Sequence, residues 1–247
     1  MDYTADYLLN KKVKIFQPTD GYRAAIDAVF LSSVIDSAKI KNSAKILDVG
    51  SGTGAVSLCL AYRLQAKQPQ ITGLEIQEDL VKLSNQSALA NDFAEILHYE
   101  HCDIRQKNAL TTGSFDFVVT NPPYSDHDMP SPNESKKFAH NHQDFNLTAW
   151  LSFSLKMLKP KGYIALINRT EALNEILSAM HNKAGNIQIL PLYSKQNQAA
   201  KRIIVIAQKG SHGLTSILPP LYTHDENGAY SEKAEQILRE AKGYFSL

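Results

Sequence analysis

Short apolar runs alternate with amphipathic stretches through most of the chain. Seven of these runs are bounded by turn residues and rich in Ile, Val and Leu, which is typical of buried strands. They cover residues 44–50, 70–76, 96–104, 115–124, 162–168, 186–194 and 201–209. Amphipathic stretches with helical spacing lie between them, at residues 55–66, 78–92, 148–158 and 171–184. This alternation predicts an α/β fold, in which a mostly parallel sheet carries helices on both faces.

The two ends of the chain lie outside this alternation. The last two predicted strands follow each other without a helix, so we expect an antiparallel pair at the edge of the sheet. A further helix is expected from Ser231, which precedes Glu235 in the manner of a helix start. We divide the chain into an N-terminal segment over 1–43, a core over 44–210, and a C-terminal extension over 211–247 whose helix packs on the core.

The charges of the chain nearly cancel, with 26 Lys and Arg against 25 Asp and Glu. This balance argues against binding to nucleic acid by global positive charge, but it leaves room for a local basic surface. The N-terminus lacks the apolar stretch of a signal peptide, and no apolar run is long enough to cross a membrane. Cys59 and Cys102 occur in apolar contexts, so we expect buried thiols rather than disulfides. We therefore expect a cytoplasmic monomer without a membrane partner.

A glycine-rich turn follows the first predicted core strand. Asp48 precedes Gly50, Gly52 and Gly54, and Glu75 ends the next strand. Glycines let the backbone turn tightly and approach a ligand, and the helix that follows offers free N–H groups. A carboxylate at Glu75 suits the two hydroxyls of a ribose. The pattern therefore predicts a site for a nucleotide-like cofactor.

Two cofactors compete for this site. The spacing Gly50-x-Gly52-x-x-Ala55 formally matches the dinucleotide fingerprint. Asp48 favours S-adenosylmethionine instead, because its carboxylate suits a cationic aminoacyl group and would face the pyrophosphate of a dinucleotide. The segment before the first core strand also favours S-adenosylmethionine, since many dinucleotide domains begin near that strand. The motif NPPY at 121–124 adds to this preference.

These motifs together resemble those of class I methyltransferases that modify planar nitrogen atoms. The resemblance covers nearly the whole chain and is carried by Asp48-x-Gly50-x-Gly52-x-Gly54, Glu75 and Asn121-Pro122-Pro123-Tyr124. Residues 21–31, 200–205 and 218–222 are similar to segments of the bacterial tRNA1(Val) adenine-37 N6-methyltransferase group. The resemblance implies a Rossmann-like sheet of seven strands whose seventh strand is reversed.

The resemblance also implies further contacts with S-adenosylmethionine. Asp103 is implied at the edge of its adenine ring, although a helix cap at a strand end is the simpler interpretation of this residue. Asn121 joins the cofactor-binding set. The segment 1–43 is implied to cover the cofactor and substrate side, with Tyr22 and Arg23 near the methionine end. Arg23 and Asp27 are also spaced to pair on one helix face.

The NPPY motif has the chemistry that a planar nitrogen needs. The exocyclic amine of adenine is a poor nucleophile, because its lone pair is delocalised into the ring. We expect the side-chain oxygen of Asn121 and the carbonyl oxygen of Pro122 to accept hydrogen bonds from both N–H groups, so that the nitrogen rehybridises as it attacks. Tyr124 is expected to stack on the base. This displacement needs no metal, and the simpler interpretation of the motif is a strand terminator.

The motif alone does not choose between adenine, guanine and a glutamine side chain. Glutamine methyltransferases that act on release factors usually carry a helical domain before the cofactor strand, and residues 1–43 are too few for one. DNA adenine methyltransferases more often carry a target-recognition domain, for which we find no room. We therefore expect methylation of an adenine N6 amine in structured RNA, with tRNA as the partner. The alternatives are a protein glutamine or small-molecule N-methyltransferase, and an RNA-binding protein without turnover.

Basic runs without acids are candidates for contacts with RNA phosphates. They comprise Lys11, Lys12 and Lys14; Lys156, Lys159, Lys161 and Arg169; and Lys195, Lys201, Arg202 and Lys209. Solvated surface explains each run as well. A polar loop at 125–147 follows NPPY and contains Asp126, His127, Asp128, His140 and His142. Their spacing does not support a metal site, so we expect a loop that shapes the substrate pocket.

Overall fold

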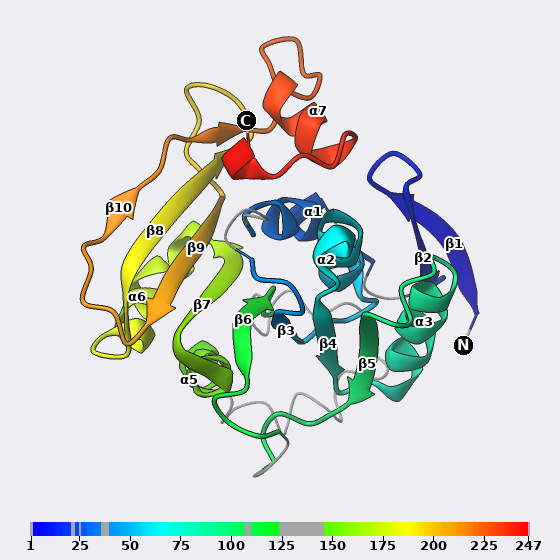
Figure 1. Cartoon of the computed structure of the whole chain (residues 1–247). Coiled ribbons are helices and arrows are strands. Elements are labelled where there is room, and N and C mark those ends of the chain that lie inside the picture. The colour runs from blue at the N-terminus through cyan, green and yellow to red at the C-terminus, as the bar shows by residue number, and fades with distance from the viewer. Residues whose placement is uncertain are drawn as a thin grey trace.

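In the described part of the chain, nine strands form one mixed sheet at the centre of the molecule (Figure 1). The computed structural model describes residues 2–20, 23–24, 26–35, 40–106, 110–123 and 146–246. All seven predicted strands are confirmed, as β3 (Lys45–Val49), β4 (Gln70–Glu75), β5 (Leu97–His101), β6 (Phe115–Thr120), β7 (Leu158–Arg169), β8 (Ala184–Tyr193) and β9 (Arg202–Lys209). Two short strands, β10 (Ser216–Ile217) and β11 (Leu221–Tyr222), pair with β8. The order β10-β8-β9-β7-β6-β3-β4-β5 confirms a Rossmann-like, mostly parallel sheet.

The antiparallel pair of β8 and β9 lies at one edge of the seven predicted strands, as expected, but the reversed strand of the pair, β9, is not itself the outermost one. β9 runs antiparallel to both of its neighbours, β7 and β8. Residues 203–207 are all buried, which is typical of an interior strand covered on both faces. The hairpin connection makes β8 and β9 neighbours but does not decide which of them lies outside. The continuous apolar run of β9 indicates that β9 is the inner strand of the pair. β8 is the outer strand, and the short strands β10 and β11 pair with it.

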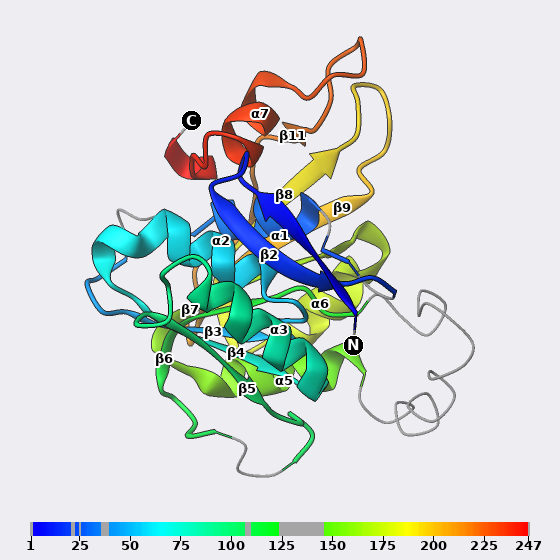
Figure 2. The same cartoon turned by 90° about the vertical axis from the view of Figure 1, so that its right-hand side faces the viewer.

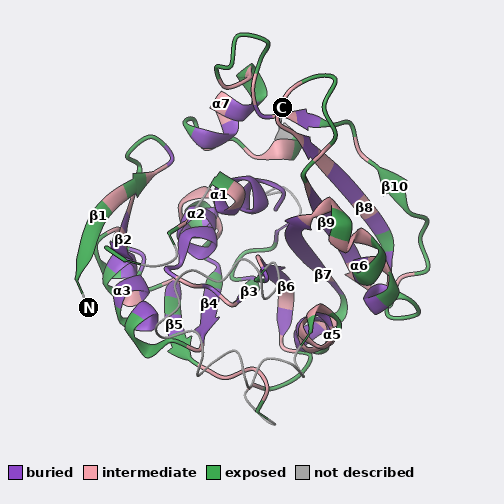
Figure 3. Cartoon of the chain, turned by 180° about the vertical axis from the view of Figure 1, so that it is seen from behind, coloured by how far each residue is buried: buried purple, intermediate pink, exposed green. Residues whose placement is uncertain are grey.

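Helices cover both faces of the sheet, as the alternation predicted. One core packs under α1 (Ile26–Ser33), α2 (Ala55–Leu64), α3 (Glu78–Leu89) and α7 (Glu232–Leu238). The other packs under α5 (Leu147–Met157) and α6 (Leu173–Met180). Ile46 of β3 belongs to the first core and Leu47 to the second, so this strand is buried on both sides (Figure 3). Its continuous apolar sequence follows from that double burial.

Short 3-10 turns mark several element ends. α2 stops two residues before its predicted end and continues as η1 (Gln65–Lys67), and η2 (Thr170–Ala172) precedes α6. η3 (Tyr244–Ser246) ends the described chain. None of the described helices has the length and hydropathy needed to span a bilayer.

An N-terminal hairpin, absent from the sequence prediction, lies beside α3 (Figures 1 and 2). It consists of β1 (Tyr3–Leu8) and β2 (Val13–Pro18), which pair antiparallel. The N–H of Lys14 donates to Oδ1 of Asn91 at 2.8 Å, and the N–H of Phe16 donates to Oγ of Ser87 at 2.9 Å. Side chains at the end of α3 therefore take the place of a third strand. Alternation in β2, where Val13 and Ile15 are buried, was the signal for this hairpin.

The C-terminal helix begins where the sequence predicted it. The Oγ of Ser231 accepts a hydrogen bond from the N–H of Ala234 at 3.1 Å, which caps α7. Arg63 of α2 donates to the carbonyl oxygens of Ile237 and Lys242, at 2.9 and 2.7 Å. These bonds satisfy carbonyl groups at the end of α7 and fasten it to the core.

Candidate active site

The ends of three neighbouring strands bring the predicted motifs together. Val49, the last residue of β3, pairs with β4 on one side and with β6 on the other. The residues at the ends of these strands, Gly50, Glu75 and Asn121, therefore lie along one carboxyl edge of the sheet. The strand order reverses here, which is where open α/β sheets bind ligands.

Glu75 is held in place by the backbone around it. The N–H of Gly52 donates to its Oε2 and the N–H of Gln77 donates to its Oε1, both at 2.9 Å. The carbonyl oxygen of Leu74 accepts from two N–H groups at the start of the glycine turn, each at 2.9 Å. Glu75 is 7% exposed, and each carboxylate oxygen keeps capacity for a further donor. This arrangement suits a ligand with two adjacent hydroxyls.

The glycines around the turn have different surroundings. Gly52 has φ 56° and a Cβ there would meet nothing within 4 Å, so it faces open space. Gly54 has φ 85°, and a Cβ there would lie 2.3 Å from Oη of Tyr99. A Cβ on Gly73 of β4 would lie 2.3 Å from Cδ1 of the same ring. Gly52 leaves room for a ligand, whereas Gly54 and Gly73 make room for Tyr99.

The first glycine of the turn, Gly50, makes room for Trp150 of α5. A Cβ on Gly50 would lie 2.6 Å from Cζ2 of the indole. The indole Nε1 donates to Oγ1 of Thr120 at 2.8 Å, and that hydroxyl donates to the carbonyl oxygen of Val49 at 2.7 Å. Trp150 thus ties α5 to the ends of β3 and β6. Neither Trp150 nor Tyr99 was predicted as part of the site, because neither belongs to a motif.

Asp48 lies beneath the turn and is 1% exposed. Its Oδ2 accepts a hydrogen bond from Oγ of Ser57 at 2.5 Å. Burial raises the pKa of Asp48 to about 7, although the hydrogen bonds from Ser57 lower it. The carboxyl group therefore faces α2, and its predicted role toward an aminoacyl group stays a prediction.

Asp103 follows β5 and is held by Arg105. The guanidinium donates from Nε to Oδ1 at 2.8 Å and from Nη2 to Oδ2 at 2.7 Å. The N–H of Arg105 donates to Oδ1 as well, at 3.0 Å. This bidentate pair fixes the plane of the carboxylate, and its contact with an adenine ring stays a prediction. Arg105 was not predicted, since an arginine two residues after a site carboxylate matches no motif.

The NPPY motif begins directly after β6. The Oδ1 atom of Asn121 is buried and accepts no hydrogen bond from any described residue. Buried acceptors without a partner are rare in folded proteins, so this atom is available to a ligand. Pro122 is buried and Pro123 is exposed. Several predicted site and loop residues lie outside the described residues: Tyr22, Tyr124, Asp126, His127, Asp128, His140 and His142.

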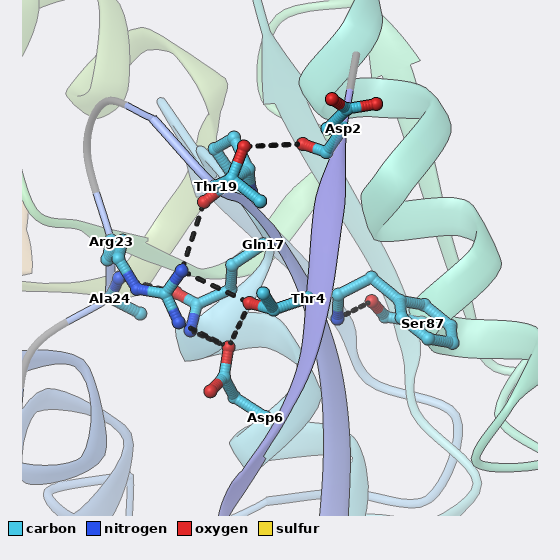
Figure 4. A network of polar contacts seen from close by, with 10 residues as sticks. Asp2, Thr4, Asp6, Gln17, Thr19, Arg23, Ala24 and Ser87 are labelled. Atoms are coloured by element: carbon cyan, nitrogen blue, oxygen red, sulfur yellow. Dashed lines mark hydrogen bonds and ion pairs between the residues drawn. The ribbon is translucent and has the colours of Figure 1, made fainter.

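Arg23 joins the N-terminal hairpin (Figure 4). Its guanidinium forms an ion pair with Asp6 of β1 at 2.5 Å and donates to Oγ1 of Thr4 at 3.1 Å. The predicted pair between Arg23 and Asp27 is wrong, because Asp27 instead pairs with Arg202 of β9 at 3.1 Å. Helix α1 starts only at residue 26, so the spacing rule for helix faces does not apply to Arg23. A contact between Arg23 and a cofactor stays a prediction.

The predicted basic runs are divided among different parts of the fold. Lys159 forms an ion pair at 2.8 Å, and Lys161 and Lys209 donate to backbone carbonyl oxygens at 2.8 and 2.7 Å. These three lysines lie at the end of the sheet away from the motifs. Lys201 and Arg202 instead line a cavity at the start of β9, on the same edge as the motifs.

The two cysteines differ in their surroundings. Cys59 is fully buried, as predicted, and burial raises its pKa to about 12. Cys102 is half-buried, which corrects the expectation of a second buried thiol. It follows β5, the outermost strand on that side of the sheet. Within the described ranges, no three His, Cys, Asp or Glu side chains gather in a way that suits a metal ion.

Known proteins share both the sequence and the fold. A family model described as "Methyltransferase domain" matches residues 40–241. A tRNA1(Val) (adenine(37)-N6)-methyltransferase of Glaesserella parasuis is 29% identical over 224 residues, covering 85% of this chain and 86% of its own length. A protein of the same name from a Shewanella species is 26% identical over 227 residues, covering 89% and 92%.

Two solved structures show the same fold. A predicted O-methyltransferase from Agrobacterium tumefaciens superposes with a TM-score of 0.70 at 22% identity, covering 85% of this chain and 94% of its own. A T. thermophilus 16S rRNA N2 methyltransferase, in complex with AdoMet and guanosine, gives a TM-score of 0.59 at 18% identity, covering 84% and 50%. At these identities the likeness concerns the fold.

Proposed function

Because the chain belongs to the methyltransferase-domain family, we propose that it transfers a methyl group from S-adenosylmethionine to the N6 amine of an adenine in structured RNA. The relatives named as tRNA adenine N6-methyltransferases support tRNA as the substrate, and a tRNA substrate implies a cytoplasmic enzyme. A glutamine side chain of a protein or a small amine is the alternative acceptor.

The unpartnered oxygen of Asn121 is the observation that carries this proposal. An N6 amine offers two N–H donors, and Oδ1 of Asn121 accepts one of them. The carbonyl oxygen of Pro122 accepts the other, and the proline ring limits its movement. Acceptors held in place before the amine arrives need little reorganisation as the nitrogen becomes tetrahedral. Its surplus proton then leaves to water.

The described residues fit S-adenosylmethionine. When bound, this cofactor supplies a methyl group activated by a sulfonium centre. Open space at Gly52 and the fixed carboxylate of Glu75 support a ribose beside the turn. We assign Asp103 to the adenine edge and Asn121 to the methyl-transfer region. We assign Asp48, Gly50, Gly54, Tyr22 and Arg23 to the remaining cofactor set, with Tyr22 and Arg23 in the segment 1–43 that covers the core of 44–210.

The extension 211–247 completes this division of the chain. Its helix α7 packs against α1, which belongs to the covering segment. We therefore propose that the extension stabilises the segment 1–43 by packing against it, and that it lies away from the reacting atoms.

The decisive variant is Asn121→Ala. We expect it to lower kcat by a factor of roughly 100 or more, which is the loss typical of removing one preorganised acceptor or donor. Affinity for S-adenosylhomocysteine, measured by calorimetry, should change little. Asn42→Ala is the matched control, because Asn42 is exposed at the opposite edge of the sheet. Unchanged turnover in Asn121→Ala would overturn the mechanism.

The acceptor class needs a separate experiment. The protein is incubated with radiolabelled S-adenosylmethionine and, in separate reactions, total RNA, total protein and DNA. We expect label in RNA, recovered as N6-methyladenosine after digestion. Label in protein alone would replace RNA by the glutamine alternative while leaving the methyltransferase assignment intact.

A further inference from the structure

A cavity of about 220 Å³ opens at the same carboxyl edge of the sheet as the NPPY motif. Its walls come from the first turn of α1, the connection between β8 and β9, and the chain that follows β11. Phe30 and Leu192 form apolar walls, and both are buried. Drug-sized ligands occupy pockets of roughly 300–1,000 Å³, so this cavity suits one small group rather than a whole nucleoside.

Among the described residues, two cations and one carboxylate line the cavity. Lys201 and Arg202 contribute cations, and Asp27 contributes the carboxylate among the described lining residues. Asp27 pairs with Arg202 at 3.1 Å and lies in the first turn of α1, where the helix dipole also favours its charge. Lys201 is exposed, and its ammonium group forms no hydrogen bond or ion pair with another described residue. The lining therefore retains a cation for an incoming anion.

A neighbouring strand adds to the positive charge. Arg169 at the end of β7 pairs directly with Arg202 in the antiparallel register. Directly opposite residues project from the same face of a sheet, so both guanidinium groups stand on the α1 side. Two arginines therefore stand side by side on this face of the sheet.

Polar groups that bind phosphate oxygens complete the lining. Ser194 and His224 both border the cavity. His224 is oriented by a contact of 2.8 Å between its Nδ1 and Oγ1 of Thr223. Cations together with hydroxyl and imidazole donors match the oxygens of a phosphate group.

The position of the cavity relates it to the NPPY motif. β6, which leads into Asn121, is followed across the sheet by β7 and then by β9. Adjacent strands lie about 4.8 Å apart, so the start of β9 lies roughly 10 Å across the sheet from the end of β6. A base in the motif carries ribose-phosphate on both sides, and this chain can reach the cavity.

We infer that the cavity lined by Lys201 and Arg202 binds a backbone phosphate of the RNA beside the target adenine. This inference rests on the proposed RNA methylation. A glutamine side chain brings no fixed anion near the reacting nitrogen, so the cation cluster favours a nucleic acid over a protein acceptor. The near-neutral charge of the whole chain makes such local contacts decisive for where RNA binds.

The test compares Lys201→Gln with Lys45→Gln. Lys45 is exposed at the opposite end of the sheet, at the start of β3. Binding of a synthetic RNA hairpin with an adenine in its loop is measured by fluorescence anisotropy at several salt concentrations. Loss of one phosphate contact should lower the slope of log affinity against log salt by about 0.7–0.9. Lys201→Gln should also raise KM for RNA roughly threefold to tenfold with kcat nearly unchanged, since phosphate contacts position the substrate.

Arg202 needs a more conservative change, because it also pairs with Asp27. Arg202→Lys keeps the charge and the ion pair but removes the planar fork, so we expect weaker RNA binding in a folded protein. If Lys201→Gln and Arg202→Lys both bind RNA as Lys45→Gln does, the phosphate site is refuted while RNA methylation stands. If wild-type protein labels protein and not RNA, the proposed function fails, and this inference fails with it.

Discussion

The variant Gly52→Ala distinguishes an effect on folding stability from an effect on cofactor binding. Gly52 has φ 56°, so an alanine there adopts a left-handed conformation that costs about 1–2 kcal/mol. The added Cβ meets no protein atom within 4 Å, so no packing penalty is expected. Gly210 is a matched control, because it has φ 62° and a Cβ there also meets nothing within 4 Å. Both variants should lose the same stability in urea unfolding.

The two variants should differ in cofactor binding. A methyl group forced into a filled site costs about 1–3 kcal/mol, which corresponds to a loss of roughly 5-fold to 150-fold in affinity. We expect this loss for S-adenosylhomocysteine in Gly52→Ala, measured by calorimetry, and none in Gly210→Ala. Equal affinities in the two variants would show that the open space above Gly52 is not the ligand site, and would refute the reasoning.

Three further predictions concern stability. Burial raises the pKa of Asp48 to about 7 from an ordinary 3.8, so the neutral form stabilises the fold at low pH and that stabilisation is lost as pH rises toward 7. Each pH unit is worth about 1.4 kcal/mol, so the free energy of unfolding of cofactor-free wild type should fall by up to about 4 kcal/mol relative to Asp48→Asn between pH 4 and pH 7. Urea titrations at several pH values measure this difference, and parallel pH dependences of the two proteins would contradict it. Gly73→Ala should lower the free energy of unfolding by about 1–3 kcal/mol, because its Cβ clashes with Tyr99. If the losses of Gly73→Ala and Tyr99→Leu simply add in the double variant, no such clash exists. Ser231→Ala should lower the free energy of unfolding by about 1 kcal/mol, because it removes the cap of α7. Ser231→Asp should keep the stability of wild type, since an aspartate side chain also caps a helix.

The core strands were predictable because each is an apolar run between turn signals. β3 and β9 are buried on both faces, and their sequences show it. The edge order was not predictable from the hairpin connection alone, because a hairpin constrains neighbours and not which strand lies outside. The N-terminal hairpin was missed for a different reason. The short alternation in β2 indicates a strand, but its bonding partners, the side chains of Ser87 and Asn91, lie more than 70 residues away, and no local pattern reveals them.

The residues of the candidate site were likewise predictable only in part. Gly52, Glu75 and Asn121 were found because they belong to motifs with fixed spacing. Tyr99 was not, because its place against Gly54 and Gly73 comes from packing that only the fold creates. Arg105 was not, because an arginine two residues after a carboxylate belongs to no motif.

The indole that lies against the glycine turn has a practical consequence. Trp150 is the single tryptophan of the chain, and its ring touches both the turn of β3 and the threonine that precedes the NPPY motif. Excited at wavelengths that tyrosine does not absorb, its emission therefore reports on one place only. The molecule carries a built-in optical probe at the junction of its two motifs, and ligand titrations can be followed without any label.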